Sequence, residues 1–418
     1  MRDGSGETAA DAPTGATRRD AVDVARVLAL LLVVLGHLAL AVIDSPDGEV
    51  RGANLLALHT GWSVVAALAP MPVFFAAAGW ANATATLTSS APRLRSLVGV
   101  GAAVVVTLSI GVVVAVAVTG EAGTIGDGAR IATQPLLFIA AYAPLAVLGA
   151  TIARAADRHV VVTLVGALAI LAAGDVARFG LGAPDWIGWP GFYLAWGVPW
   201  VLGAWWRARY VAGAIDEVRT GGALLAVGIA AGALLVAVAG YDAALIDAVD
   251  GRRSNTTPPT LYTAVAGVAQ VGALLVAAPH LDRMGRRRRR LWDRAGEAAV
   301  GVYAWHLTAL ALCAGIVALG APAPERLTAT WWLTRPLWWA AVLLVTLALV
   351  VLTAAVRARR QRSGDPPGTL TAVVGVALAT AGAALVGLRG PRTVALAVAC
   401  SAAFVAAWTL LRPRPNLP

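Results

Sequence analysis

The chain has 418 residues, of which 59% are hydrophobic and only 13% are charged, and its mean hydropathy is +0.74. Soluble domains contain about 45–50% apolar and about 25% charged residues, so this composition excludes a water-soluble globule. The formal net charge is +10, and all 33 basic residues are arginine. Without lysine the chain has neither Schiff-base chemistry nor the lysine of a Walker A loop, which excludes an ATP-driven pump of that type.

A membrane-spanning helix needs about 20 mostly apolar residues, and segments of this kind recur along the whole chain. They lie at about 22–43, 62–81, 97–119, 131–152, 160–177, 189–206, 221–240, 260–279, 296–319, 335–356, 369–388 and 392–411. The fold class predicted from them is an all-α polytopic membrane protein, a bundle of about 10–12 transmembrane helices. Polar residues 1–20 and 412–418 are interpreted as cytoplasmic tails, the first of them disordered, and 357–368 as a basic cytoplasmic linker.

The arginines indicate how this bundle is oriented. With the first tail in the cytoplasm, the inner segments hold 23 arginines and the outer loops hold 9, and Arg26 lies inside the first span. This satisfies the positive-inside rule and predicts a multi-pass protein of the plasma membrane with both termini in the cytoplasm. The run RMGRRRRR at 283–290 is expected to touch anionic lipid head groups, so the basic charge does not call for nucleic acid as a partner.

The first span carries three ionisable residues, Asp23, Arg26 and His37. Eleven residues separate Arg26 from His37, which is three helical turns plus about 20°, so the two side chains share a stripe about 16 Å long. A buried neutral imidazole suits general-base catalysis. The alternatives are that Arg26 is an interfacial anchor paired with Asp23, and that His37 makes a structural hydrogen bond between helices.

Two further segments hold polar candidates. His306 lies near the middle of the ninth span, and Tyr303, three residues earlier, shares its helix face. Asn255 lies in the outer loop 241–260, which either dips toward a site or simply starts the next helix. The five histidines are scattered, and Cys313 and Cys400 are far apart, so no metal-binding motif is present.

Several of these segments, taken in order, resemble the acyltransferase 3 family of membrane O-acyltransferases. DVARVLALLLVVLGH (23–37) is similar to that family's first-helix signature, an arginine and a histidine with ten residues between them. The other similar segments are APMPVFFAAAGW (69–80), which is followed by Arg93 and Arg95, SNTTPPTLYTAVAGVAQ (254–270), VYAWHL (302–307) and WWLTRPLWW (331–339). The resemblance covers about 21–356, a membrane domain of about ten helices, and leaves 369–411 as an accessory helix pair.

The resemblance implies transfer of an acyl group from cytoplasmic acyl-CoA, with acetyl-CoA as the first expectation, to a hydroxyl of an envelope glycan or glycolipid. No permanently bound cofactor is expected. His37 is the expected general base with His306 assisting, and Arg26, Arg93 and Arg95 would meet the anionic donor.

One departure from the family limits the chemistry, because its frequent Ser-Gly after the Phe-Phe pair is Ala78-Gly79 here, which removes a serine nucleophile. The main alternative is a multi-pass transporter or flippase for a lipid-linked or polar envelope substrate, and a catalytically inactive membrane scaffold is a third.

Overall fold

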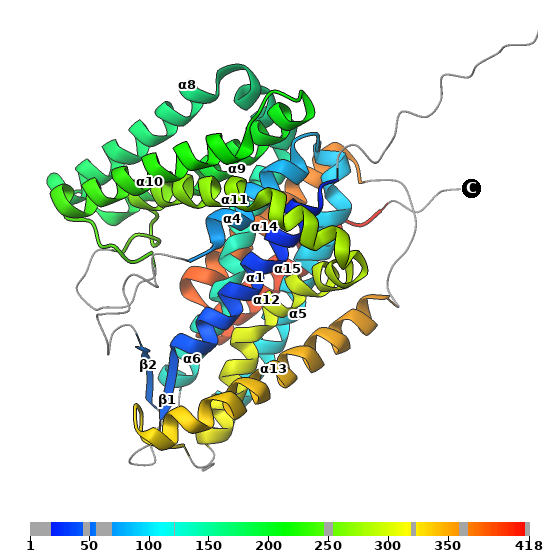
Figure 1. Cartoon of the computed structure of the whole chain (residues 1–418). Coiled ribbons are helices and arrows are strands. Elements are labelled where there is room, and N and C mark those ends of the chain that lie inside the picture. Colours follow the sequence, from blue (N-terminus) through cyan, green and yellow to red (C-terminus); the bar gives the residue numbers. More distant parts are fainter. Residues whose placement is uncertain are drawn as a thin grey trace, which may run out of the picture.

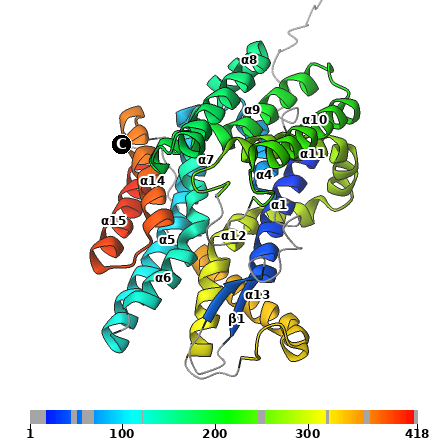
Figure 2. The same ribbon diagram turned by 90° about the vertical axis from the view of Figure 1, so that its left-hand side faces the viewer.

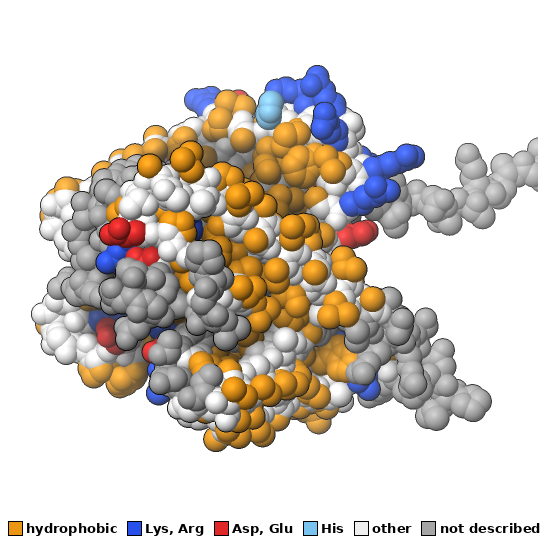
Figure 3. All heavy atoms as spheres, turned by 90° about the horizontal axis from the view of Figure 1, so that it is seen from below, with side chains coloured by type: hydrophobic (Ala, Val, Ile, Leu, Met, Phe, Trp, Pro, Cys, Tyr) orange, Lys and Arg blue, Asp and Glu red, His pale blue; other side chains and the backbone are white. Residues whose placement is uncertain are grey.

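The computed structural model describes residues 18–44, 51–55, 69–120, 122–245, 254–318, 323–358 and 367–413. In this part of the chain nearly all residues are helical, and nine helices are long and apolar enough to cross a membrane. The protein is therefore an all-α polytopic membrane protein, as predicted from hydropathy (Figure 1). Figure 3 shows a broad face of hydrophobic side chains, with most of the visible arginines at its margins.

The described elements are mostly α-helices, with one pair of short strands. The helices are α1 (Asp20–Leu40), α4 (Met71–Asn82), α5 (Leu87–Thr119), α6 (Ala122–Thr133), α7 (Leu137–Val147), α8 (Gly149–Asp175), α9 (Gly191–Val211), α10 (Glu217–Ala239), α11 (Leu261–Arg287), α12 (Arg289–Ala318), α13 (Ala329–Ala358), α14 (Thr369–Arg389) and α15 (Val394–Leu410). Short 3₁₀ or π turns occur at Gln134–Leu136, Val176–Gly180 and Asp185–Gly188, and the strands are β1 (Ala41–Asp44) and β2 (Arg51–Asn54).

Helix α1 ends three residues earlier than its hydropathy predicts. The apolar stretch continues to Ile43, but residues 41–44 form β1, which pairs antiparallel with β2 in the register Ala41 to Asn54. Branched residues such as Val42 and Ile43 fit an extended strand well, and the partner strand supplies the backbone hydrogen bonds. The predicted second span, 62–81, is seen only as α4, because 56–68 lie outside the described residues.

Helix α5 begins ten residues before the predicted span. Thr86 and Ser89 form a capping box, in which Thr86 Oγ1 accepts from the Ser89 backbone N–H and Ser89 Oγ accepts from the Thr86 N–H at 2.9 Å. Such a box satisfies backbone donors that would otherwise be unpaired. Arg93 and Arg95 therefore lie on the early turns of α5, before the predicted span begins.

The predicted fourth span, 131–152, is interrupted, although Ile125–Val147 together stay long and apolar enough to cross a membrane. Pro135 lies in a 3₁₀ turn between α6 and α7, and α8 starts at Gly149. Proline lacks the backbone N–H that continues a helix, so the chain divides this apolar stretch into shorter pieces.

Close helix contacts in the core depend on small residues. Helices α4 and α9 cross so tightly that a Cβ added at Gly79 would collide with the backbone of Trp200, and one at Gly203 would collide with the carbonyl of Ala76. Membrane helices approach closely where small residues line the contact. This crossing fixes the aromatic layer of Phe74 and Phe75 against Phe138 and Trp196.

Gly203→Val should accordingly cost about 1–3 kcal/mol or more, because the added atoms must push α9 away from α4. The measurement is the midpoint of thermal unfolding in detergent. Gly166→Val is the matched control, since nothing lies within 4 Å of its Cβ position. Equal midpoints for the two variants would show that the crossing is looser than described.

The terminal pair α14 and α15 packs into the main core beside α5 and α7 (Figure 2). Phe404 and Trp408 of α15 fill the space left by Gly101 and Gly99 of α5. Polar contacts add to this packing, because Thr133 Oγ1 donates to the Val386 carbonyl at 3.0 Å. The pair is therefore an integral layer of the bundle.

One end of the bundle, here called the basic end, carries Arg18, Arg19 and the arginine run where α11 meets α12. At this end Arg19 is 7% exposed and joins α1 to α10 and α11 through Glu217 and Asp282. Its guanidinium also lies 4.0 Å from the ring centre of Tyr210. Burial lowers the pKa of Arg19, but its hydrogen bonds to Glu217 and Asp282 outweigh burial and leave that pKa raised.

Candidate active site

The two histidines of the sequence prediction meet in the structure. His37 in the last turn of α1 and His306 in α12 share a hydrogen bond, with 2.7 Å between His37 Nδ1 and His306 Nε2. Their rings are nearly parallel, 10° apart, with centroids at 5.0 Å. The sequence placed both in apolar spans, and the packing of α1 against α12 brings these spans together.

The second nitrogen of His306 fixes the direction of this hydrogen bond. His306 Nδ1 lies 2.6 Å from the Tyr303 carbonyl oxygen, and a carbonyl only accepts, so Nδ1 carries the proton. In a neutral imidazole Nε2 then holds the lone pair, and His37 Nδ1–H donates to it. His37 Nε2 is consequently left with its own lone pair available.

Burial differs between the two rings. His306 is fully buried, at 0% exposure, while His37 is partly exposed. Beside His37, Leu35 is 51% exposed and a Cβ at Gly36 would meet nothing within 4 Å. His306 is thus a fixed partner inside the protein, and His37 is the less buried member of the pair.

Tyr303 contributes through its backbone as well as its ring. Its carbonyl holds His306, and its buried side chain packs edge-on against Phe138 at 5.0 Å and lies tilted against His306 at 5.8 Å. The expected shared face of Tyr303 and His306 is therefore present, and the i−3 carbonyl is the contact that orients the imidazole.

Asp23 and Arg26 lie at the basic end of α1, on the first turns of the helix. Arg26 is 3.6 Å from Asp23, which also binds Arg18 at 2.7 Å. The Arg26 side chain keeps 38% exposure and lies alongside Gly296 of α12. The ion pair between Arg26 and Asp23 agrees with the interpretation of Arg26 as an interfacial anchor. The exposed part of the Arg26 side chain leaves room for an anion.

The other two arginines predicted to meet the donor differ in their surroundings. Arg93 is exposed on α5, whereas Arg95 is half-buried with its guanidinium 5.3 Å from the Trp408 ring centre. Arg95 therefore faces α15, and its described contacts do not link it to Arg26.

Asn255 belongs to the loop that leads into α11. Its amide donates to the carbonyls of Asp242 and Ala244, and its side-chain oxygen accepts from Thr260 at 2.9 Å. These contacts organise the loop and occupy the Asn255 side chain.

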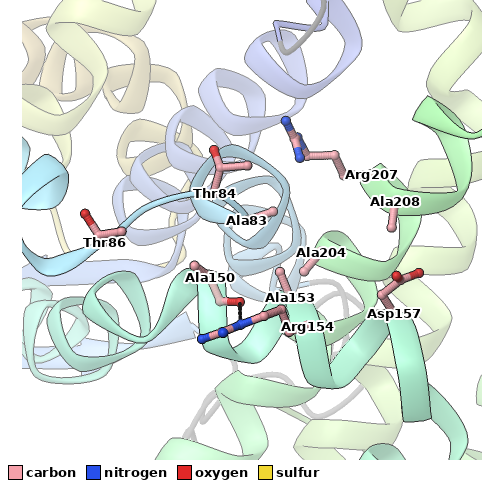
Figure 4. Close-up of a pocket in the computed structure, with 10 residues that line it drawn as sticks. All are labelled: Ala83, Thr84, Thr86, Ala150, Ala153, Arg154, Asp157, Ala204, Arg207 and Ala208. Carbon is pink, nitrogen blue, oxygen red and sulfur yellow. Dashed lines mark hydrogen bonds between the residues drawn. The ribbon is translucent and has the colours of Figure 1, made fainter.

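A hollow at the basic end was missed in the sequence. It has a volume of about 590 Å³ and lies between the end of α4 and the facing parts of α8 and α9 (Figure 4). Arg154, Asp157, Arg207, Thr84 and Thr86 supply its polar lining. The three segments that line this hollow are far apart in sequence. The only sequence signal for it is the general excess of arginine in the segments at the basic end.

Comparison with known proteins gives one match. The family model described as an acyltransferase domain matches residues 19–355, more than half of the chain. No curated protein and no solved structure gives a significant match. The matched region runs from α1 through most of α13 and includes both histidines, Arg26, Arg93 and Arg95, while α14 and α15 lie beyond it. The resemblance seen in the sequence is thereby confirmed: the chain belongs to the acyltransferase 3 family and is a membrane acyltransferase.

Proposed function

We propose that this protein transfers an acyl group, acetyl in the simplest case, from acyl-CoA to a hydroxyl of an envelope carbohydrate or glycolipid. The observation that carries the proposal is the bond between His37 and His306 inside an acyltransferase domain. A histidine held in one tautomer by a second group is the usual arrangement of a general base.

The geometry supports a single-step transfer. His37 Nε2 takes the proton of the acceptor hydroxyl while the hydroxyl oxygen attacks the thioester carbonyl carbon. The carbon–sulfur bond then breaks, and the departing thiolate takes that proton from His37 to leave as CoA thiol. His306 Nε2 accepts from His37 Nδ1–H throughout and so stabilises the imidazolium that forms.

The arginine distribution supports donor binding at the basic end. This end is cytoplasmic under the positive-inside rule, and acyl-CoA carries phosphates that arginine binds well. Arg26 is exposed there, and Arg154 and Arg207 line the hollow. Since Arg26 and His37 are about 16 Å apart along α1, the acyl end of an extended donor would reach toward His37 from Arg26.

The acceptor is proposed to come from the opposite side. His37 lies in the last turn of α1, and α12 continues beyond His306 from Leu307 to Ala318, a rise of about 18 Å. In the proposed orientation His37 therefore lies toward the envelope end of α1, which is the side from which we expect the acceptor.

The experiment is to incubate purified protein with acyl-labelled acyl-CoA and an envelope extract, and to follow both the label and free CoA thiol. We expect label in an alkali-labile ester on carbohydrate or glycolipid, with one thiol released per ester. A transporter would instead move an unmodified substrate into vesicles without releasing thiol, and that outcome would overturn the proposal.

Arg26→Ala should raise the acyl-CoA concentration needed for half-maximal transfer by about tenfold, which corresponds to about 1.4 kcal/mol. The maximal rate should change little, because Arg26 is proposed to meet the donor and not the reacting atoms. Arg392→Gln is the control, since Arg392 lies between α14 and α15 and pairs with Asp127 of α6. A fall in maximal rate with an unchanged donor requirement would contradict the donor role.

A further inference from the structure

The last turn of α1, which carries His37, is held by two side chains of α13. Trp339 Nε1–H donates to the Leu38 carbonyl at 3.0 Å, and Arg335 donates to the Ala41 carbonyl. The final carbonyls of a helix have no partner within the helix. Both carbonyls lie just after His37 in sequence, that of Leu38 in the last turn of α1 and that of Ala41 at its C-cap, so α13 fixes the backbone that follows the imidazole.

Arg335 is buried in this position without full satisfaction of its hydrogen-bonding groups. It is 4% exposed, its guanidinium lies 4.1 Å from the Trp331 ring centre, and its Nε has no hydrogen-bond partner among the described residues. A buried cation is costly, but it is favoured at a helix C-terminus, where the carbonyl ends carry partial negative charge. The buried Arg335 guanidinium is therefore well placed to hold the C-terminal end of α1 in position.

The same helix also packs on the partner histidine's helix. One hydrophobic cluster joins α1, α12 and α13, with Leu38, Leu307 and Val342 among its buried members. Further along, Val350 of α13 fills the space beside Gly301 of α12. Helix α13 thus touches both helices whose separation sets the distance between the two rings.

We propose that Arg335 and Trp339 are positioning residues, which hold His37 Nδ1 against His306 Nε2 and so keep His37 in the tautomer with its Nε2 lone pair free. The kinetic consequences of this positioning rest on the proposed function, whereas the tautomer of His37 can be measured whether or not the protein transfers acyl groups. Neither residue is expected to touch the donor or the acceptor.

The kinetic test compares Trp339→Phe and Arg335→Gln with two matched controls. Trp332→Phe changes a more exposed tryptophan of the same helix. Arg392→Gln removes an arginine whose described partner is Asp127 of α6 and not a residue of α1. We expect kcat to fall about tenfold in each test variant with an unchanged KM for acyl-CoA. Arg335→Lys, which keeps one donor and the charge, should recover part of the loss.

A double substitution separates positioning from general structure. In a His37→Gln background, Arg335→Gln should lower turnover no further, because the group that it positions is already gone. An additional tenfold loss there, or a rise in KM in place of the fall in kcat, would overturn the proposal.

A spectroscopic readout is independent of catalysis. With ¹⁵N-labelled histidine, the wild-type protein should show His37 as the Nδ1–H tautomer, identified by loss of its signal in His37→Gln. Trp339→Phe and Arg335→Gln should convert it to a mixture of tautomers, and the controls should not. An unchanged tautomer in folded Trp339→Phe and Arg335→Gln would reject positioning, even if acyl transfer itself were absent.

Discussion

His37→Gln is expected to lower acyl transfer by about 10²–10⁴-fold, the usual effect of losing one positioned proton acceptor. Glutamine preserves much of the size and hydrogen bonding of histidine but does not take a proton at neutral pH. His37→Ala should show a loss of the same order. The measurement is initial rate at saturating acyl-CoA, normalised to the amount of monodisperse protein.

The abundance of both variants should stay near that of the wild type, because His37 is only partly buried and lies in the last turn of its helix. His280→Gln is a suitable control, since that histidine lies on α11 toward the basic end. Near-normal turnover in His37→Gln would show that the bond to His306 is purely structural.

The second large effect is expected on stability and not on chemistry. Arg19→Met should cost about 3–5 kcal/mol, because it leaves the carboxylates of Glu217 and Asp282 buried without their cation. These side chains are only 12% and 13% exposed, and Asp282 also accepts from the Ala21 backbone N–H at 2.8 Å. Thermal unfolding in detergent measures the loss.

Arg18→Met is the matched control for this position. Arg18 also pairs with two carboxylates, Asp23 and Asp293, but its side chain is 48% exposed. Exposed ion pairs contribute about 0–1 kcal/mol. If both substitutions shifted unfolding equally, the buried network would not be what joins α1 to α10 and α11.

Hydropathy predicted the helices well because burial in lipid imposes a strong compositional demand. It failed at element ends, where local chemistry decides. The capping box at Thr86 extends α5 toward its N-terminus, β2 turns residues after Leu40 into a strand, and Pro135 divides an apolar stretch. None of these changes the hydropathy of the segment, so a hydropathy profile does not register them.

The candidate site was predicted in its residues but not in its geometry. The eleven-residue spacing of Arg26 and His37 follows from helix periodicity alone. The hydrogen bond from His37 to His306 joins positions 269 apart in the chain, and it depends on how α1 packs against α12. The tautomer assignment needed one more contact, the Tyr303 carbonyl, which no sequence pattern specifies.

Arg95 and Asn255 show the opposite limit. Both lie in or after segments that resemble the family, yet the Arg95 guanidinium lies against Trp408, and, within the described part of the chain, the Asn255 side chain bonds only to residues of its own loop. A motif gives the residue type at a position, but only the packing of the folded chain shows which residues that side chain contacts.

The most direct test of the central claim is the pH dependence of kcat/KM for the acceptor in wild type and in His37→Gln. A general base must be unprotonated to act, so transfer by the wild type should fall by about tenfold per pH unit on the acidic limb. Because His37 and His306 share a hydrogen bond, this limb belongs to the pair. The residual transfer of His37→Gln should lack the acidic limb. An acidic limb that persists unchanged in His37→Gln would contradict the account, because some other group would then be the base.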